Sequence, residues 1–270
     1  MKVVGIMTCY NRKNKTVESI NRLLNGNREH VFEFVVTDDN SNDGTVESLS
    51  AIPEVTVIGG DGNLFYSGGM RKGIAYVKEN GITCDYVLFF NDDVEFYDGI
   101  IGKMIAYADG NAEIVVGATE SDDGTLSYGG VKKKSKFKPS FTVIMSKDKK
   151  EYCDTFCANC VLIPFSVFSE LDNIDGKFVH SLGDYDYGLT ATEKGYKISV
   201  TDFFVGRCND NPVSQSWLDR TKTRKERLKL KESPKGLPRD IWFYFIKKHY
   251  GFISAVTFSL SQYLKILLKI

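Results

Sequence analysis

The stretch YVLFFNDDV, residues 86–94, sets five aromatic or aliphatic residues directly before Asn91, Asp92 and Asp93. Similar short runs, rich in Val, Ile, Phe and Leu, occupy residues 2–7, 32–36 and 55–58. Runs of this length and composition are typical of parallel strands that are buried on both faces. Together they predict the centre of one α/β sheet.

Helices are predicted between these runs, at about residues 14–25, 43–50 and 68–80. Strand–helix–strand units of this length form right-handed crossovers and build a doubly wound sheet. Ligands bind such sheets outside the carboxyl ends of the strands. The residues that follow each strand are therefore the first candidates for a functional site.

Each predicted strand runs into a polar segment. These segments are TCYNR (8–12), TDDNS (37–41), GGDGNLFYSGGMR (59–71) and NDDV (91–94). One alone is typical of a turn, because Asn, Asp and Gly dominate turns, but four at one sheet edge favour a site. Asp92 and Asp93 offer the hard oxygen ligands that Mg²⁺ or Mn²⁺ prefers when substrate phosphates complete its shell.

The glycine-rich segment 59–69 lets the backbone approach a ligand closely, and Arg71 is placed to pair with a phosphate. The segment is not a dinucleotide-binding fingerprint, since Phe65 stands where the third glycine belongs. The chain also has no Gly-Lys-Ser/Thr phosphate loop.

Five motifs in order resemble the inverting nucleotide-sugar glycosyltransferases of family 2, whose fold is called GT-A, and among them the rhamnosyltransferase-like branch of surface-polysaccharide enzymes. They are MTCYNR (7–12), DDNSNDGT (38–45), GNLFYSGG (62–69), NDDV (91–94) and GDYDYGL (183–189). The resemblance covers about residues 2–210. It implies a mostly parallel, doubly wound sheet with flanking helices.

The resemblance also implies roles for single residues. Asp184 would be the catalytic base, with Asp186 in reserve, and Asp93 would be the metal-binding end of the family's Asp-x-Asp element. Thr8, Tyr10 and Asp39 would border the nucleoside, and Asp39 would accept a hydrogen bond from a pyrimidine imide. The full set expected to bind the nucleotide sugar is Thr8, Tyr10, Asn11, Arg12, Asp39, Asn63, Gly69, Arg71 and Asp92.

Two departures from the family pattern reduce the number of carboxylates. Asn91 stands where the Asp-x-Asp element begins, and Gly183 stands where the family has the Glu of a Glu-Asp pair. In some relatives a histidine completes the metal shell. Cys208 or Asn209 falls in that region, and neither is predicted to be a ligand.

Cys153, Cys157 and Cys160 have the spacing of radical enzymes that hold an iron–sulfur cluster. Residues 160–164 look like a strand and lie past the middle of the chain, so buried core cysteines are the favoured interpretation. A strand begins at residue 2 with no basic leader before it, so we expect a cytosolic protein whose six cysteines are reduced. His30 and His249 are expected at the surface.

Charge divides the 270-residue chain into two parts. Residues 220–270 contain 13 Lys or Arg and 3 Asp or Glu, a balance of +10, whereas residues 1–219 contain 22 and 32, a balance of −10. We expect a GT-A glycosyltransferase domain at 1–212 and a basic, amphipathic helical extension at 213–270, with a basic helix at 217–230. The acidic body argues against a nucleic-acid partner.

The last 19 residues, 252–270, contain too many polar side chains for a membrane span. Beside a basic helix they are typical of an interfacial helix on an anionic leaflet. A helical hairpin packed on the body, or on the partner of a homodimer, is the alternative interpretation.

The expected function is transfer of a sugar from a UDP- or dTDP-sugar to a hydroxyl of a lipid-linked or oligosaccharide acceptor in surface-polysaccharide synthesis. The expected cofactor is Mn²⁺ or Mg²⁺, and the expected location is the inner face of the cell membrane. Two alternatives stay open: a non-catalytic nucleotide-sugar-binding protein, and a nucleotidyltransferase. The latter usually carries a basic glycine-rich loop after its first strand, where NRKN (11–14) has no glycine.

Overall fold

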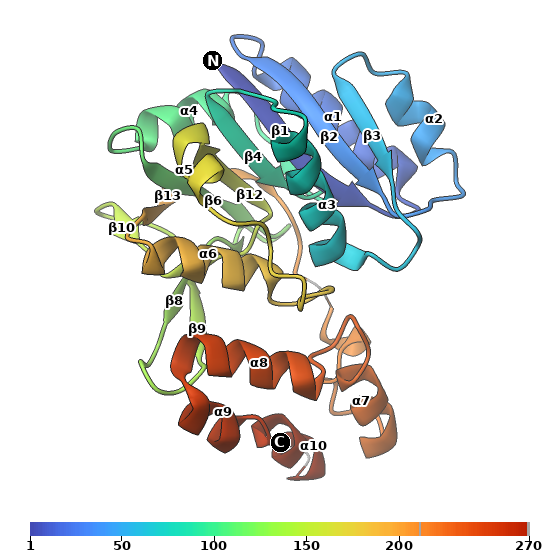
Figure 1. Cartoon of the computed structure of the whole chain (residues 1–270), viewed down its shortest axis with the longest axis vertical. Coiled ribbons are helices and arrows are strands. Elements are labelled where there is room, and N and C mark those ends of the chain that lie inside the picture. Colours follow the sequence, from blue (N-terminus) through green and yellow to red (C-terminus); the bar gives the residue numbers. More distant parts are fainter. Residues whose placement is uncertain (211, 269–270) are drawn as a thin grey trace.

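The computed structural model describes residues 1–210 and 212–268 (Figure 1). Among these residues, ten strands form the main sheet, in the order β10-β13-β6-β12-β4-β1-β2-β3, with β5 beside β13 and β7 beside β6. They are β1 (Lys2–Cys9), β2 (Val31–Asp38), β3 (Val55–Gly59), β4 (Tyr86–Phe90), β5 (Glu95–Phe96), β6 (Glu113–Glu120), β7 (Leu126–Tyr128), β10 (Glu151–Tyr152), β12 (Cys160–Pro164) and β13 (Lys197–Arg207).

The four strands predicted from the sequence form the parallel half of this sheet. β1 pairs in parallel with β2 and β4, and β2 pairs in parallel with β3. β12 runs antiparallel between β4 and β6, and β13 returns parallel to β6. The predicted fold class, a mostly parallel α/β sheet of GT-A type with flanking helices and a helical C-terminus, is confirmed.

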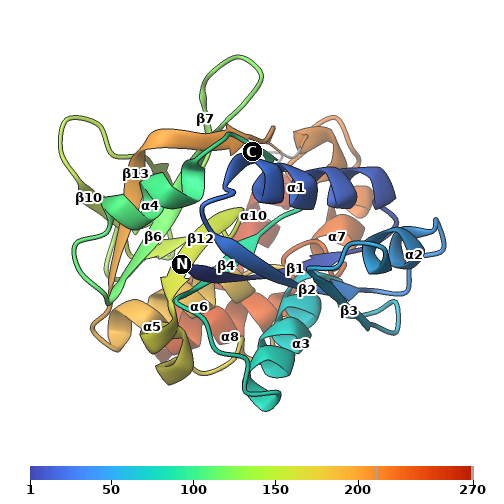
Figure 2. The ribbon, with the colours of Figure 1, turned by 90° about the horizontal axis from the view of Figure 1, so that it is seen from above.

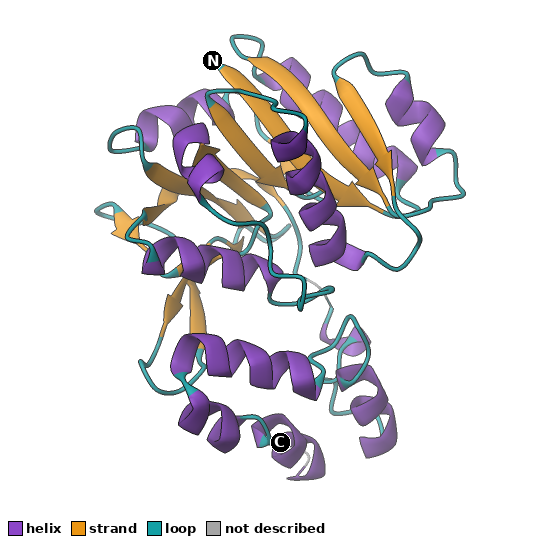
Figure 3. Ribbon diagram, viewed as in Figure 1, coloured by secondary structure: helices purple, strands orange, loops and turns teal. Residues whose placement is uncertain are grey.

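Helices cover both faces of the sheet (Figures 2 and 3). α1 (Lys13–Gly26), α2 (Thr45–Ser50) and α4 (Ile100–Tyr107) cover one face; α3 (Phe65–Glu79), α5 (Phe165–Glu170) and α6 (Gly183–Glu193) cover the other. Successive strand side chains point to opposite faces. Thus Val4 and Ile6 pack in one core, and Val3 and Met7 pack in the other. A two-sided core explains the continuous apolar runs in the sequence.

A second unit lies beyond the edge of the sheet at which these parallel strands end (Figure 1). Its elements are a small sheet of β8 (Gly130–Lys133), β9 (Phe141–Ile144) and β11 (Thr155–Phe156), a 3₁₀ turn at Val213–Gln215, and helices α7 (Arg224–Lys231), α8 (Arg239–Tyr250), α9 (Phe252–Phe258) and α10 (Ser261–Leu268). Trp242, Phe245 and Ile246 of α8 pack with Phe178 and with Leu189 of α6 in a third apolar cluster. This cluster fixes α8 to the body of the protein.

The basic helix is shorter than predicted. It begins at Arg224 rather than Trp217, because Thr223 and Glu226 form a capping box there. Two of its basic side chains, Arg227 and Lys231, are buried rather than solvated. Lys231 donates to the carbonyl of Leu237 and pairs with Glu232.

The prediction of one helix over 252–270 is also wrong in detail, and its place at a membrane interface stays a prediction. The segment forms two short helices, α9 and α10, and Lys269 and Ile270 lie outside the described residues. In the described part of the chain, no helix combines the length and apolar character that crossing a membrane requires.

Candidate active site

Polar segments from distant parts of the chain meet at one edge of the sheet. Cys160, the first residue of β12, pairs with Phe90, the last residue of β4, so Asn159 lies beside Asn91. The backbone N–H of Asn91 donates to the carbonyl of Asn159 at 3.2 Å. β13 runs parallel to β6 and brings Cys208 to the same edge. The parallel sheet therefore gathers the acidic motif, Asn159 and Cys208 in one place.

Backbone strain is concentrated around this edge. Within the described residues, four non-glycine residues have positive φ: Asn11 (50°), Asn40 (67°), Phe65 (52°) and Leu182 (71°). They lie after β1, after β2, at the start of α3 and just before α6. Bulky residues such as Phe and Leu rarely adopt this conformation, and strain of this kind clusters at functional sites. The loops of the site are thus held by their surroundings rather than by local preference.

Arg12 connects the two carboxylates of the acidic motif. Its Nη1 donates to Oδ1 of Asp92 at 2.7 Å and to Oδ2 of Asp93 at 3.2 Å. Asp92 is buried beneath α1 and also accepts from the Thr16 hydroxyl. Burial raises the pKa of Asp92, and the adjacent Arg12 opposes that rise. Asp92 therefore anchors Arg12, while Asp93, whose side chain is 32% exposed, is the carboxylate open to a ligand.

Cys208 faces the other oxygen of Asp93. Its Sγ lies 3.7 Å from Oδ1 of Asp93 and accepts from the Asn159 amide at 3.5 Å. Asn209 instead donates to Asp122 at 2.7 Å. Over residues 1–210 and 212–268, no three His, Cys, Asp or Glu side chains are grouped so as to hold a metal ion. Asp93 is the part-exposed carboxylate of the acidic motif, and its oxygens are hard donors of the kind that Mg²⁺ and Mn²⁺ take.

Asp184 lies in the first turn of α6, at a helix N-terminus. Its Oδ1 accepts the N–H of Tyr185 at 2.8 Å, and its Oδ2 accepts the N–H of Ala158 at 3.4 Å. Burial raises the pKa of Asp184 to about 6, and these backbone donors limit the rise. A carboxylate with this pKa is ionised at neutral pH and basic enough to accept a proton.

The glycine-rich start of α3 holds the loop that leads to Asp184. The N–H groups of Ser67 and Gly68 both donate to the carbonyl of Val179, and the Ser67 hydroxyl donates to the carbonyl of His180 at 2.7 Å. A side chain at Gly183 would overlap Ser67. The glycine-rich segment was predicted to bring its backbone close to a ligand. In the structure, its residues 67–68 bring their backbone close to residues 179–180 of the same chain.

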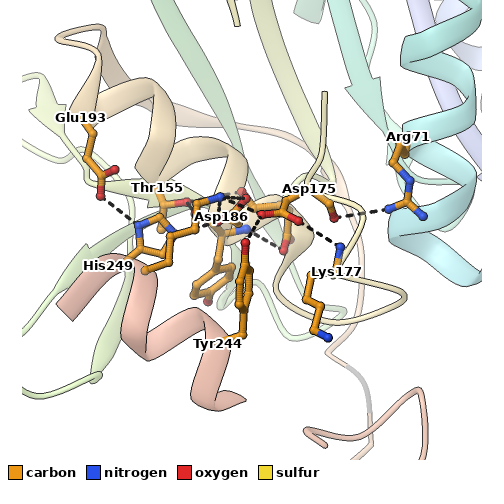
Figure 4. Close-up of polar contacts among 11 residues, drawn as sticks. Arg71, Thr155, Asp175, Lys177, Asp186, Glu193, Tyr244 and His249 are labelled. Atoms are coloured by element: carbon orange, nitrogen blue, oxygen red, sulfur yellow. Dashed lines mark hydrogen bonds and ion pairs between the residues drawn. The ribbon is translucent and has the colours of Figure 1, made fainter. Parts of the chain in front are cut away.

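Arg71 takes part in the same arrangement. Its guanidinium donates to the carbonyls of Asp175, at 3.4 Å, and Phe178, at 3.0 Å (Figure 4). Its own carbonyl accepts from Asn173 at 2.9 Å. The structure thus shows Arg71 bracing the loop before α6, and pairing with a phosphate stays a prediction.

Tyr66, in the first turn of α3, packs against the core between the sheet and α3 and α6 and was not singled out from the sequence. Burial raises the pKa of its hydroxyl well above the ordinary value, and the charges of Asp184, Cys157 and Asp93 raise it further. Its hydroxyl is therefore neutral and within electrostatic range of both candidate carboxylates. Its position inside the quoted motif GNLFYSGG was the available signal.

Asp39 shapes the loop after β3. Its Oδ1 accepts the N–H groups of Gly62 at 2.8 Å and Leu64 at 3.3 Å, and its Oδ2 accepts that of Phe65 at 3.0 Å. These bonds fix the entry to α3. The contact with a pyrimidine that was predicted for Asp39 stays a prediction.

Thr8 and Gly69 pack against each other. A Cβ at Gly69 would overlap the Thr8 hydroxyl, and the carbonyl of Gly69 accepts from Thr37 at 2.8 Å. Gly69 therefore sets the distance between α3 and β1, which is a packing role.

The remaining predicted ligands lie on the surface of this edge. Tyr10 is 55% exposed, and Asn63 is also exposed. Asn11 ties the β1 loop to the β2 loop, since its N–H donates to Ser41 at 2.8 Å and its side chain accepts from Asn42 at 2.9 Å. These residues are available to a ligand at the carboxyl edge.

Asp186, the reserve base, is committed elsewhere (Figure 4). Its carboxylate is buried and contacts Nζ of Lys248 at 2.7 Å and Nε2 of His249 at 2.8 Å. His249 also contacts Glu193 at 2.9 Å, and Lys248 contacts Asp175 at 3.2 Å. Asp186 thus attaches α8 to α6 and does not face Asp93.

The prediction that His30 and His249 are exposed is wrong. The His249 side chain is fully buried against α6, and the His30 side chain is 9% exposed. For both histidines, no local sequence pattern indicated the segment that covers the side chain.

The three spaced cysteines do not converge. Cys153 packs in the core beside α3 and α6, whereas Cys160 packs in the core on the opposite face of the sheet, where its Sγ lies 3.7 Å from Sδ of Met104. Cys157 instead contacts the Tyr185 hydroxyl at 3.8 Å. All are free thiols, as the favoured interpretation had it, and the geometry does not fit a cluster.

Comparison with known proteins agrees with this architecture. The family model described as "Glycosyl transferase family 2" matches residues 6–172, so the chain belongs to glycosyltransferase family 2. A comparison with curated protein sequences gives no match.

Two solved structures are similar in fold. One is GalNAc-T7 with UDP, GalNAc and Mn²⁺, at 12% identity and a TM-score of 0.56, covering 99% of this chain and 57% of that one. The other is the mannosyltransferase PcManGT from Pyrobaculum calidifontis in complex with GDP-Man and Mn²⁺, at 14% identity and a TM-score of 0.54, covering 96% and 74%. The chain therefore spans little more than half the length of GalNAc-T7, and the likeness establishes the fold.

Proposed function

We propose that the protein is a metal-dependent, inverting glycosyltransferase that moves a sugar from a UDP- or dTDP-sugar to a hydroxyl of a lipid-linked or oligosaccharide acceptor. We assign it to the rhamnosyltransferase-like branch of surface-polysaccharide synthesis, at the inner face of the membrane. One observation carries the proposal: the Asp184 carboxylate accepts the N–H of Ala158, and the next residue, Asn159, accepts the N–H of Asn91 at the start of the acidic motif, so both candidate carboxylates belong to the same edge of the sheet.

On the donor side, Asp93 is the residue that would hold Mn²⁺ or Mg²⁺. When bound, the ion would neutralise the negative charge that builds on the departing nucleoside diphosphate. Both similar structures, GalNAc-T7 and PcManGT, are complexes with Mn²⁺, which supports a divalent ion. Arg12, already beside Asp93, would add a second positive charge on this side of the site.

On the acceptor side, Asp184 would act as the base. Its carboxylate takes the proton of the acceptor hydroxyl as that oxygen attacks the anomeric carbon, and the bond from this carbon to the diphosphate oxygen breaks. A positioned base of this kind contributes roughly 10²–10⁴-fold to the rate. One base and one direct displacement invert the anomeric configuration.

The other predicted ligands divide into two groups under this proposal. Thr8, Tyr10, Asn11, Asp39 and Asn63 surround the nucleotide from the β1, β2 and β3 loops. Gly69, Arg71 and Asp92 support the site from behind, through the contacts described above. We propose that this second group positions the ligand-binding residues.

The test is thermal stability against UDP, dTDP, GDP and CMP, each with and without Mn²⁺, for the wild-type protein and Asp93→Ala. A nucleotide at about 100 times its Kd should stabilise the protein by roughly 2.7 kcal/mol. We expect a Mn²⁺-dependent rise with UDP or dTDP that Asp93→Ala abolishes. No rise with any nucleotide would contradict the proposed donor, whereas a rise without turnover would favour a non-catalytic binding protein.

A further inference from the structure

The segment of α9 and α10 exposes most of its large apolar side chains. Phe252, Ile253, Val256, Leu260, Leu264, Leu267 and Leu268 are each between 49% and 83% exposed, whereas Ala255 and Ile266 are buried. Polar side chains of the same segment face the protein, since Ser254, Ser259 and Gln262 are 4–8% exposed. A helix that packs on a soluble body normally has the reverse pattern.

The exposed side chains form one stripe on each helix. At 100° per residue, Leu264, Leu267 and Leu268 fall within one side of α10, and Ile266 and Gln262 fall on the opposite side; the exposed Leu260 directly precedes this helix. Phe252, Ile253 and Val256 share one side of α9 in the same way. We call these seven side chains the outer apolar face.

Helices α9 and α10, which carry most of the outer apolar face, lie at the end of the molecule farthest from the main sheet (Figure 1). Basic side chains accompany it. Lys265 is exposed on α10 itself, and Arg224, Lys225 and Lys229 are exposed on α7, which packs against α10. Residues 220–270 have a balance of +10. In an anionic leaflet, aliphatic side chains of this kind insert at the level where the acyl chains begin. Lysine and arginine around them pair with the negatively charged headgroups.

We propose that the outer apolar face, together with the exposed basic residues of α7 and α10, is a docking surface for an anionic lipid bilayer. The inference rests on the proposed function and deepens it: an enzyme bound to the bilayer would meet a lipid-linked acceptor in the same membrane. The charge favours lipid over a second copy of the chain, since two copies of this end would each bring the same positive charge to the interface.

Removal of the tail is unsuited to testing this surface. Deleting residues 238–270 would remove Trp242, Phe245 and Ile246 and expose Phe178 and Leu189. Substitutions confined to exposed side chains leave that cluster intact. The test is therefore the triple variant Ile253→Ser/Leu264→Ser/Leu267→Ser, with Val31→Ser/Phe137→Ser as the control for exposed apolar residues elsewhere.

The measurement is co-sedimentation of the full chain with vesicles of phosphatidylcholine alone and of phosphatidylcholine with phosphatidylglycerol. We expect binding to the anionic vesicles, weakened by salt. The triple variant should bind at least about tenfold more weakly. Burying one aliphatic side chain in the bilayer changes the affinity by about this factor, and the variant removes three such side chains. Arg224→Gln/Lys225→Gln/Lys229→Gln should also weaken binding, whereas Lys15→Gln/Lys103→Gln, on exposed lysines of α1 and α4, should not.

Equal binding of the triple variant and the wild-type protein would overturn the proposal, as would absence of wild-type binding to anionic vesicles. A wild-type dimer that the triple variant converts to a monomer, without vesicle binding, would assign the face to a second copy instead. None of these results depends on turnover. Nucleotide-dependent thermal stabilisation, measured on the same variants, reports on the proposed function separately.

Discussion

Asp184 and Asp186 are two residues apart on α6, and the structure gives them opposite tasks. We predict that Asp186→Asn weakens the fold and leaves the chemistry intact. The substitution preserves the size of the side chain but removes a buried negative charge from contacts with Lys248 at 2.7 Å and His249 at 2.8 Å.

The magnitude follows from the environment of these partners. Breaking a buried ion pair by removing one partner costs about 3–5 kcal/mol, and a hydrogen bond to a charged group is worth about 1.5–3 kcal/mol. Lys248 is 31% exposed and keeps Asp175, so part of its interaction survives. We therefore expect Asp186→Asn to lower the free energy of unfolding by about 2–4 kcal/mol.

Urea unfolding followed by tryptophan fluorescence measures this change, because Trp242 lies in the α8 cluster that the ion pairs attach. Turnover per folded molecule, measured below the unfolding transition, should stay within a few-fold of wild type. Loss of turnover at wild-type stability would refute the reasoning and make Asp186 the base.

Further predictions concern other parts of the site. Because burial raises the pKa of Asp184 to about 6 in the ligand-free protein, kcat/KM should fall about tenfold per pH unit below pH 6 as the base becomes protonated, and a pH–rate profile of kcat/KM measures this limb. Gly69→Ala should lower stability by about 1–3 kcal/mol through overlap with Thr8, whereas Gly59→Ala, where a Cβ meets nothing within 4 Å, should be nearly neutral in thermal unfolding. Arg12→Gln should destabilise the protein by about 1–3 kcal/mol, because it leaves the Asp92 carboxylate buried beside a neutral partner. Arg22→Gln is the matched control, since it removes an exposed ion pair with Glu18 and should change the stability little.

The parallel strands and their polar ends could be predicted because both signals are local. A strand buried on two faces needs an unbroken apolar run, and the chain must turn where that run ends. Thus β4 and the acidic residues after it were visible in YVLFFNDDV alone. The family motifs then indicated the order of the site segments along the chain.

The partners of these segments could not be predicted, because they come from distant parts of the chain. Ser67 and Arg71 donate to carbonyls more than a hundred positions away in the sequence. The glycine-rich segment was therefore predicted to bind a ligand, although it also holds the loop before α6 in place. Asp186 resembled a catalytic residue because nothing in its neighbourhood in sequence shows that His249 covers it. The exposure of most large apolar side chains of α9 and α10 likewise becomes visible only when the surface that each helix packs against is known.

The most direct test of the proposed mechanism is Asp184→Asn, studied for both binding and transfer. An acid whose pKa rises on folding favours its protonated form, so the ionised Asp184 opposes folding at pH 7. The neutral Asn should therefore raise the free energy of unfolding by about 1–3 kcal/mol. We expect unchanged stabilisation by the nucleotide with Mn²⁺, and transfer reduced by about 10²-fold or more. Transfer that persists at more than about a tenth of the wild-type rate, with nucleotide binding intact, would contradict the assignment of Asp184 as the base.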